Sequence, residues 1–162
     1  MVRLRRLIIG LIGLSASALF SGLETGAYSL NRLRLHVLSH HGDRNAVLLR
    51  ALVTNPTRLL GTLLIGNNIA NYIGTAAVTV LVESRRLPEW EVVAINAAVV
   101  TPLLFIFGET LPKDLFGEYA DRLMYRFARP LHALSRFFTG IGALPLIDGF
   151  SRGGAALLRL PH

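Results

Sequence analysis

Cysteine is absent from this chain of 162 residues, and acidic residues are scarce beside basic ones. Without cysteine there can be no disulfide framework, no thiolate metal site and no cysteine nucleophile. Charged residues make up only 17% of the sequence and hydrophobic residues 52%, a larger apolar share than soluble domains carry. The sequence also has no nucleophile–base pair and no phosphate-binding loop, so it does not indicate an enzyme.

Charged residues are missing from four stretches of the chain. These stretches are Leu7–Leu23, Leu59–Val82, Val92–Gly108 and Phe137–Ile147. A membrane-spanning helix needs roughly 20 mainly apolar residues, within a range of about 17–25. The second stretch is long enough alone, the first and third are long enough with their flanks, and the fourth is too short. The sequence therefore predicts an all-α integral membrane protein.

Three transmembrane helices are expected, over residues 4–20, 57–82 and 92–108, the last kinked by its proline. Amphipathic juxtamembrane helices are expected over 28–53, as a pair with a turn at its centre, and over 114–147. The short apolar run Phe137–Ile147, at the end of the segment 114–147, favours a helix lying along the membrane interface over a fourth span.

The beginning of the chain has two interpretations. Its basic residues, apolar core and small residues at Ser15–Ala18 are also typical of a secretory signal peptide. The polar residues that follow continue a membrane element, and further spans come after it, which favours a retained helix. We therefore expect one membrane domain over residues 1–150 and a C-terminal tail over 151–162.

Basic residues outnumber acidic ones by 17 to 10, which gives a net charge of +7. In a soluble protein this balance would suggest nucleic-acid binding. Here arginine and lysine collect beside the apolar stretches, so nucleic acid is not an expected partner. The most basic connectors, residues 28–58 and 113–136, should face the cytoplasm of a multi-pass protein of the plasma or inner membrane. The N-terminus would then lie outside and the C-terminus inside, although the basic N-terminus argues the other way.

Each predicted span carries polar residues within it or at its end. They are Ser21, Glu24 and Thr25 for the first span, Asn67, Asn68 and Asn71 for the second, and Glu109 and Thr110 for the third. Ionisable residues in membrane helices cost about 2.5–3.5 kcal/mol on insertion scales and usually face a cavity or a partner. All of these side chains offer oxygen, and the five histidines lie elsewhere.

The spacing of the asparagines predicts a polar helix face. Asn67 and Asn71 stand four residues apart, so one face presents both carboxamides, and Asn68 with Asn71 would serve almost as well. Helix breaks near Gly22 and Gly108 would free backbone carbonyls at the same depth. Neutral oxygens with one or two carboxylates suit a hard cation such as Mg²⁺, Ca²⁺ or Na⁺, and exclude zinc and copper.

Each polar residue also has a plainer interpretation. Asparagine in a membrane helix often only holds helices together, at about 0.6 kcal/mol on average. Glu109 could reach water at the end of its span, and Ser21 could bond back to its own helix. The agreement among three segments favours an ion site over a structural or regulatory membrane subunit whose polar residues only pack helices.

The polar residues belong to three longer motifs: FSGLETGAYSLNRLRL, NPTRLLGTLLIGNNIANYIGTA and FIFGETLPKDLF. In order and spacing these motifs resemble the transmembrane domain of the CorC/CNNM family of magnesium transporters. The resemblance covers about residues 15–145. It implies three membrane helices with juxtamembrane helices, a homodimer, and outward movement of Mg²⁺ in exchange for Na⁺.

The resemblance also implies a set of magnesium ligands. In that family a dehydrated Mg²⁺ is held by the serine of an SGxET motif, two asparagines of a GNNxxN motif and the glutamate of a GExxPK motif. The matching residues here are Ser21, Asn67, Asn71 and Glu109. Further candidates are Asn68, and Glu24 and Thr25 for the coupled Na⁺ or for packing. Oxygen ligands alone leave Na⁺, Ca²⁺ or Co²⁺ open as the transported ion.

The sequence departs from the family pattern in two places. Members usually continue into a cytoplasmic CBS-domain pair that binds ATP, and this sequence ends at His162 before any such pair. It is either part of a longer protein or a stand-alone membrane domain, and nucleotide regulation is not expected within it. Expected partners are a second copy of the chain, membrane lipid and a separate CBS-type regulatory domain. Leu23 stands where a small or polar residue is expected.

Overall fold

The computed structural model describes residues 2–83 and 88–145, and every regular element in this part of the chain is helical. The all-α prediction is therefore confirmed. The tail predicted over 151–162 lies outside the described residues. The chain divides into two compact units, one formed by Met1–Ser29 with Leu63–Ala120 and the other by Leu30–Thr62 with Asp121–His162.

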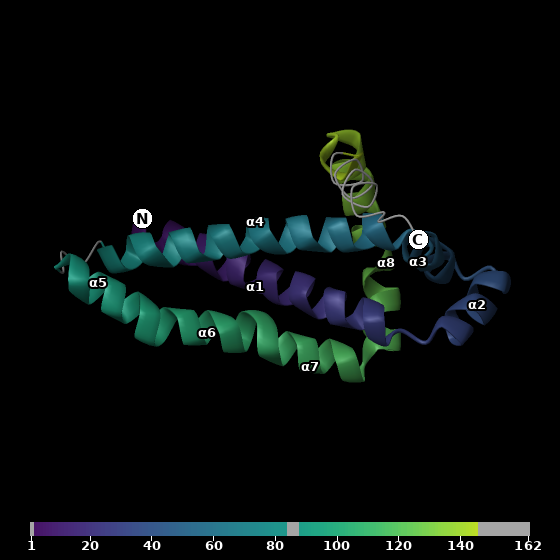
Figure 1. The fold of residues 1–162 in the computed structure, drawn as a ribbon, viewed down its shortest axis with the longest axis horizontal. Helices are drawn as coiled ribbons and strands as arrows, with labels where there is room; N and C mark the ends of the chain where they lie inside the picture. Colours follow the sequence, from purple (N-terminus) through teal and green to yellow (C-terminus); the bar gives the residue numbers. More distant parts are fainter. Residues whose placement is uncertain (1, 84–87, 146–162) are drawn as a thin grey trace, which may run out of the picture. The chain divides into compact units, whose positions relative to one another are not determined.

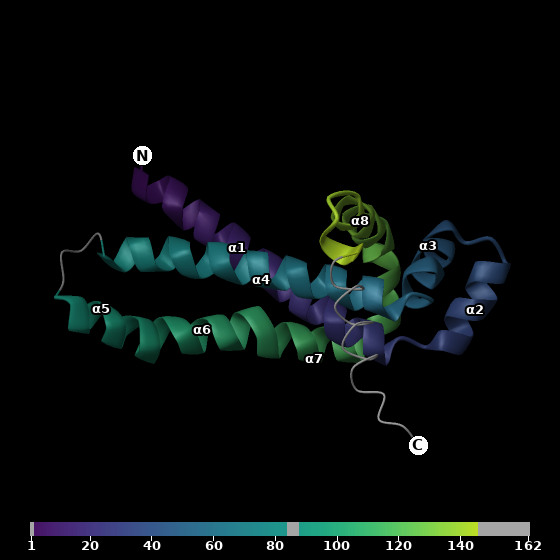
Figure 2. The same cartoon turned by 45° about the horizontal axis from the view of Figure 1, so that its top comes forward.

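The first unit contains α1 (Val2–Ser29), α4 (Pro56–Glu83) from Leu63 onward, and a third helical run. The third run consists of α5 (Glu89–Ile95), η1 (Asn96–Val100), α6 (Thr101–Phe105), η2 (Ile106–Thr110) and α7 (Leu111–Glu118). The segments η1 and η2 are π-helical turns. In Figures 1 and 2, α1 passes alongside α4 and alongside the run that ends in α7.

The break predicted near Gly22 is wrong, because α1 continues as one helix from Val2 to Ser29. A continuous helix satisfies its own backbone groups, which apolar surroundings require. The small size of Gly22 serves packing: a Cβ atom here would lie 2.3 Å from Cδ2 of Phe116. The break predicted near Gly108 is also absent, since the chain stays helical there as the π turn η2.

The third helical run is longer than predicted. It does not end at residue 108 but continues to Glu118, so the beginning of the stretch expected to be juxtamembrane belongs to α7. Pro102 was expected to kink this helix. The chain stays helical at Pro102, which lies in α6. Because proline has no backbone N–H to donate, the regular hydrogen-bond pattern is interrupted there, and the π turn η1 lies directly before α6.

Two helical segments are long and apolar enough to cross a membrane, Leu7–Ser29 and Glu89–Glu118. The helix between them in the sequence, α4, has 28 residues and carries the three asparagines. It corresponds to the second of the three predicted spans, residues 57–82. Large apolar side chains point outward from the first unit, with Leu11 63% and Phe105 60% exposed. Extended apolar surfaces of this kind mark contact with lipid or with a partner.

The second unit contains the helix pair expected over 28–53, as α2 (Arg32–His40) and α3 (Arg44–Val53). Asparagine and aspartate are strong N-cap residues because their side chains accept from free backbone N–H groups. Asn31 accepts in this way at the start of α2, and Asp43 at the start of α3. Gly42 joins the helices with φ of 80°, a conformation that glycine adopts without strain.

The helix α8 (Ala120–Gly140) completes the second unit and includes Pro130 in its interior. Asp121 contacts the start of α2 twice: Oδ1 accepts from Asn31 N at 3.1 Å, and Oδ2 pairs with Arg34 Nη1 at 3.1 Å. Further along, Arg129 Nε donates to Asn45 Oδ1 at 3.0 Å. These polar contacts fix α8 against both helices of the pair.

Candidate cation site

Two asparagines of α4 meet a serine of α1 inside the first unit. Ser17 Oγ lies 3.2 Å from Oδ1 of Asn67 and 2.5 Å from Oδ1 of Asn71. A hydroxyl has one hydrogen, so Ser17 donates to one carboxamide at a time. The face predicted from the four-residue spacing therefore exists, and both of its carbonyl oxygens turn toward α1.

Ser21 lies one helical turn beyond Ser17 on α1, on the same face. It is 0% exposed, and its Oγ has no hydrogen-bond partner among the described residues. Most buried polar side chains have a partner, and leaving one unpaired costs about 1–3 kcal/mol. The alternative in which Ser21 bonds back to its own helix does not hold. A buried hydroxyl oxygen is left available for a ligand.

Glycines bring α1 and α4 close enough for these contacts. A Cβ atom on Gly13 would lie only 2.6 Å from Gly74 N, and one on Gly66 only 2.4 Å from Cε1 of Phe20. Real Cβ atoms do not approach so closely. Small residues at membrane-helix contacts allow this approach of two backbones.

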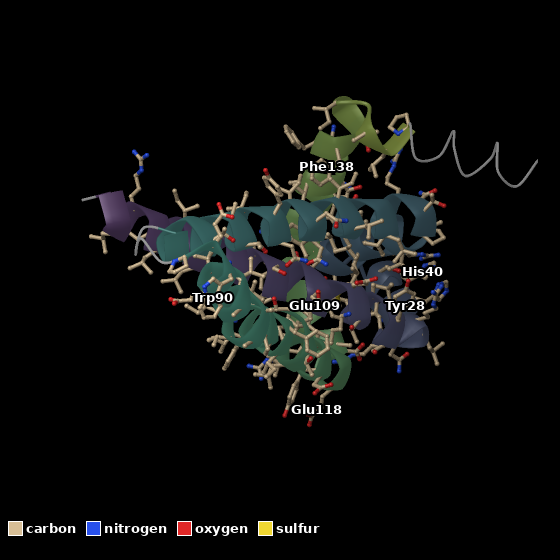
Figure 3. The ribbon with its side chains drawn as sticks, turned by 60° about the vertical axis from the view of Figure 1, so that its left-hand side comes forward. Tyr28, His40, Trp90, Glu109, Glu118 and Phe138 are labelled. Carbon is tan, nitrogen blue, oxygen red and sulfur yellow. The ribbon has the colours of Figure 1, made fainter. Side chains whose placement is uncertain are left out.

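Glu109 lies on the π turn η2, between Trp90 and Glu118 along the third helical run (Figure 3). Its side chain is half-buried, and the neighbouring Gly108 is buried. A Cβ atom on Gly108 would lie 3.6 Å from Ser17 Oγ, so η2 passes directly beside the serine of the cluster. Isolated π turns inside α-helices often occur at functional sites.

The remaining predicted residues lie differently. Asn68 is exposed, and its Nδ2 donates to Leu64 O of its own helix at 2.9 Å, so it does not join Asn67 and Asn71. Glu24 and Thr25 are half-buried on α1 and form no side-chain hydrogen bond with other described residues. The methyl group of Thr25 packs against Gly117: a Cβ atom added to Gly117 would lie 3.6 Å from it.

The sequence analysis missed Ser17. Its signal was present, because Ser17 precedes Ser21 by four residues within an uncharged stretch, the same spacing as the two asparagines. Within residues 2–83 and 88–145, no group of three histidine, aspartate or glutamate side chains gathers as a metal site. The cluster therefore combines neutral oxygens from Ser17, Asn67 and Asn71. The buried Ser21 lies one turn further along α1, and the adjacent π turn carries one carboxylate.

Long apolar helices that enclose serine and asparagine side chains define an α-helical membrane protein. The chain belongs to the family described as the cyclin M transmembrane N-terminal domain, whose model matches residues 7–160. The resemblance to the CorC/CNNM family is thereby confirmed, and the protein is membrane-embedded.

Three curated relatives match the chain. The UPF0053 inner membrane protein YfjD of Escherichia coli is 38% identical over 67% of this chain and 25% of its own length. A UPF0053 protein of Haemophilus influenzae is 36% identical over 81% of this chain and 31% of its own. The UPF0053 protein sll1254 of Synechocystis is 28% identical over 79% of this chain and 36% of its own length. The chain thus spans about a quarter to a third of the length of these relatives.

Proposed function

We propose that this chain carries Mg²⁺ across the membrane, moving it outward in exchange for Na⁺. The observation that carries the proposal is the arrangement of Ser17, Asn67 and Asn71, whose oxygens meet between α1 and α4 beside the glutamate-bearing π turn. Membership in a transmembrane family whose relatives include an inner membrane protein agrees with transport across a membrane.

The proposed ligands are Ser21, Asn67, Asn71 and Glu109. Mg²⁺ prefers oxygen ligands near octahedral geometry and gives up its waters reluctantly. The Glu109 carboxylate would offset part of the dehydration cost by its negative charge. Each carboxamide oxygen has two lone pairs, so Asn67 and Asn71 can accept from Ser17 and still face an ion.

A transported ion must also leave its site. Ser21 and the two asparagines would complete the ligand shell without adding charge, so the bound state would not be too stable for release. In the proposed topology the N-terminus lies outside, the basic connectors face the cytoplasm, and two copies of the chain form the transporter. A separate CBS-type regulatory domain is the proposed soluble partner.

Two alternatives follow from specific features. The hydrogen bonds of Ser17 are also what helix packing requires, so the cluster could be purely structural. In that case removal of a carboxamide would change helix association and leave ion binding unaffected. The oxygen-only ligand set also suits Na⁺, Ca²⁺ or Co²⁺, because selectivity among such cations depends on cavity size and rigidity.

Calorimetric titration of the purified chain with Mg²⁺ tests the proposal. Wild type should bind saturably, and Glu109→Gln and Asn71→Ala should both abolish the binding. Asn68→Ala is a matched control, because it removes an exposed carboxamide from the same helix. Folded wild-type protein that binds no Mg²⁺, or equal loss in Asn68→Ala, would refute the site. Competing titrations with Na⁺, Ca²⁺ and Co²⁺ would identify another ion.

Transport needs a second measurement. Chains reconstituted in liposomes should move Mg²⁺ only when a Na⁺ gradient is imposed, and Glu109→Gln should remove that flux. Mg²⁺ binding without Na⁺-driven flux would leave the ion site in place and contradict the coupling.

A further inference from the structure

An open hollow of about 150 Å³ lies between α2 and α3. Its lining combines side chains that bind anions with an apolar wall. These residues are Arg32, His36, Arg50 and Thr54, with Leu35 and Val53 on the apolar side. Since a water molecule occupies about 30 Å³ in the liquid, the hollow has room for a phosphate group together with water.

The two arginines of the hollow have no anionic partner among the described residues. Neither Arg32 nor Arg50 forms an ion pair with another residue in the described part of the chain, where the pair of this unit is Arg34 with Asp121. Arg50 uses Nη1 to donate to Ser39 Oγ at 3.0 Å and keeps its other N–H groups. Two unpaired guanidinium groups beside one hollow favour an anion between them, and guanidinium matches phosphate geometry well.

The hollow is attached to membrane helices at both ends of the pair. Arg32 begins α2 three residues after Ser29, where α1 and its apolar segment end. Thr54 lies two residues before Pro56, the first residue of α4. Lipid head groups border the hydrocarbon core at the ends of membrane-spanning helices.

We infer that this hollow binds a phosphate group carried by an anionic membrane lipid. Arg32 and Arg50 neutralise the phosphate charge, and the imidazole of His36 donates a further hydrogen bond. Leu35 and Val53 contact the apolar part of the lipid next to the head group. Basic pockets beside membrane helices bind anionic head groups in this way. The inference is independent of which ion the chain transports.

Native mass spectrometry of the full chain in detergent tests the site, with phosphatidylglycerol as the probe and zwitterionic phosphatidylcholine as the reference lipid. Arg32→Gln should weaken phosphatidylglycerol binding about fivefold, the effect of one cation near an anionic head group. Arg32 is exposed and forms no hydrogen bond with other described side chains, so this variant should keep its fold. Arg122→Gln, an exposed site on α8, makes the same charge change outside the hollow.

Millimolar inorganic phosphate then identifies the source of the phosphate group. Phosphatidylglycerol binding that depends on Arg32 and resists free phosphate supports a lipid site. Displacement of the lipid by inorganic phosphate, again dependent on Arg32, supports the phosphate site with a soluble source. Equal lipid binding by wild type and Arg32→Gln, or an equal loss in Arg122→Gln, would overturn the inference.

Discussion

Ser17→Ala is the sharpest test of how the proposed cation site is built. Ser17 is only 2% exposed, and the substitution removes an oxygen that lies 3.2 Å and 2.5 Å from the carboxamide oxygens of Asn67 and Asn71. Alanine fits the same space and has the higher helix propensity. The helix should therefore remain intact while the two carboxamides lose the group that orients them.

The magnitude follows from two estimates. Loss of a typical hydrogen bond lowers the free energy of unfolding by about 0.5–1.5 kcal/mol. Loss of a group that orients metal ligands costs about 10–100-fold in metal affinity. Because Ser17 reaches two proposed ligands but bonds to one at a time, we expect a loss near the lower end, about tenfold in Mg²⁺ affinity.

The assay is calorimetric Mg²⁺ titration with the melting temperature measured on the same sample. Ser15→Ala is the matched control, since Ser15 lies on the same helix and is exposed. Wild-type affinity in Ser17→Ala would refute an orienting role for this hydroxyl. A lower affinity in Ser17→Ala with wild-type affinity in Ser15→Ala would support it.

Gly13→Ala should separate α1 from α4, because its Cβ would lie 2.6 Å from the backbone of Gly74; overpacking of this kind costs about 1–3 kcal/mol. The melting temperature of Gly13→Ala should fall. Gly140→Ala is the control, because a Cβ atom at Gly140 would meet no atom within 4 Å, and its melting temperature should stay at the wild-type value. Equal melting temperatures for the two variants would contradict the packing of α1 on α4. Burial, and secondarily the charge of Asp121, raises the pKa of Tyr125 in the folded protein. The contribution of Tyr125 to stability should therefore be complete below the pKa it has in the unfolded chain, and it should be lost as the pH rises through its pKa in the folded protein. Melting temperatures of wild type and Tyr125→Phe across alkaline pH check this, and parallel curves would contradict it. Asn71→Asp should bind Mg²⁺ more tightly but transport it more slowly in liposomes, because a second carboxylate would resist release; faster flux would contradict the argument.

The sequence was sufficient to predict features that depend on local spacing. The four-residue spacing of Asn67 and Asn71 predicted their common face, and both carboxamides meet Ser17. The turn expected at the centre of residues 28–53 lies between α2 and α3. These features need only the helical period and the chemistry of one side chain.

Features that depend on a distant partner could not be predicted in this way. Gly22 looked like a helix break because glycine is a poor helix former. In the structure Gly22 instead makes room for the ring of Phe116, on a helix far along the chain. The same sequence evidence is compatible with both roles, and only the identity of the packed neighbour separates them.

The chemistry of the cluster is compatible with the proposed site for a transported ion. A permanent structural metal site would gain most from several charged ligands with their own hydrogen bonds. Here the contacts around Ser17 involve neutral oxygens, the buried Ser21 hydroxyl has no partner among the described residues, and one glutamate lies on the adjacent π turn. A site with one charge and neutral ligands can compete with water for a cation and still release it. The proposed ion transport requires this balance between binding and release.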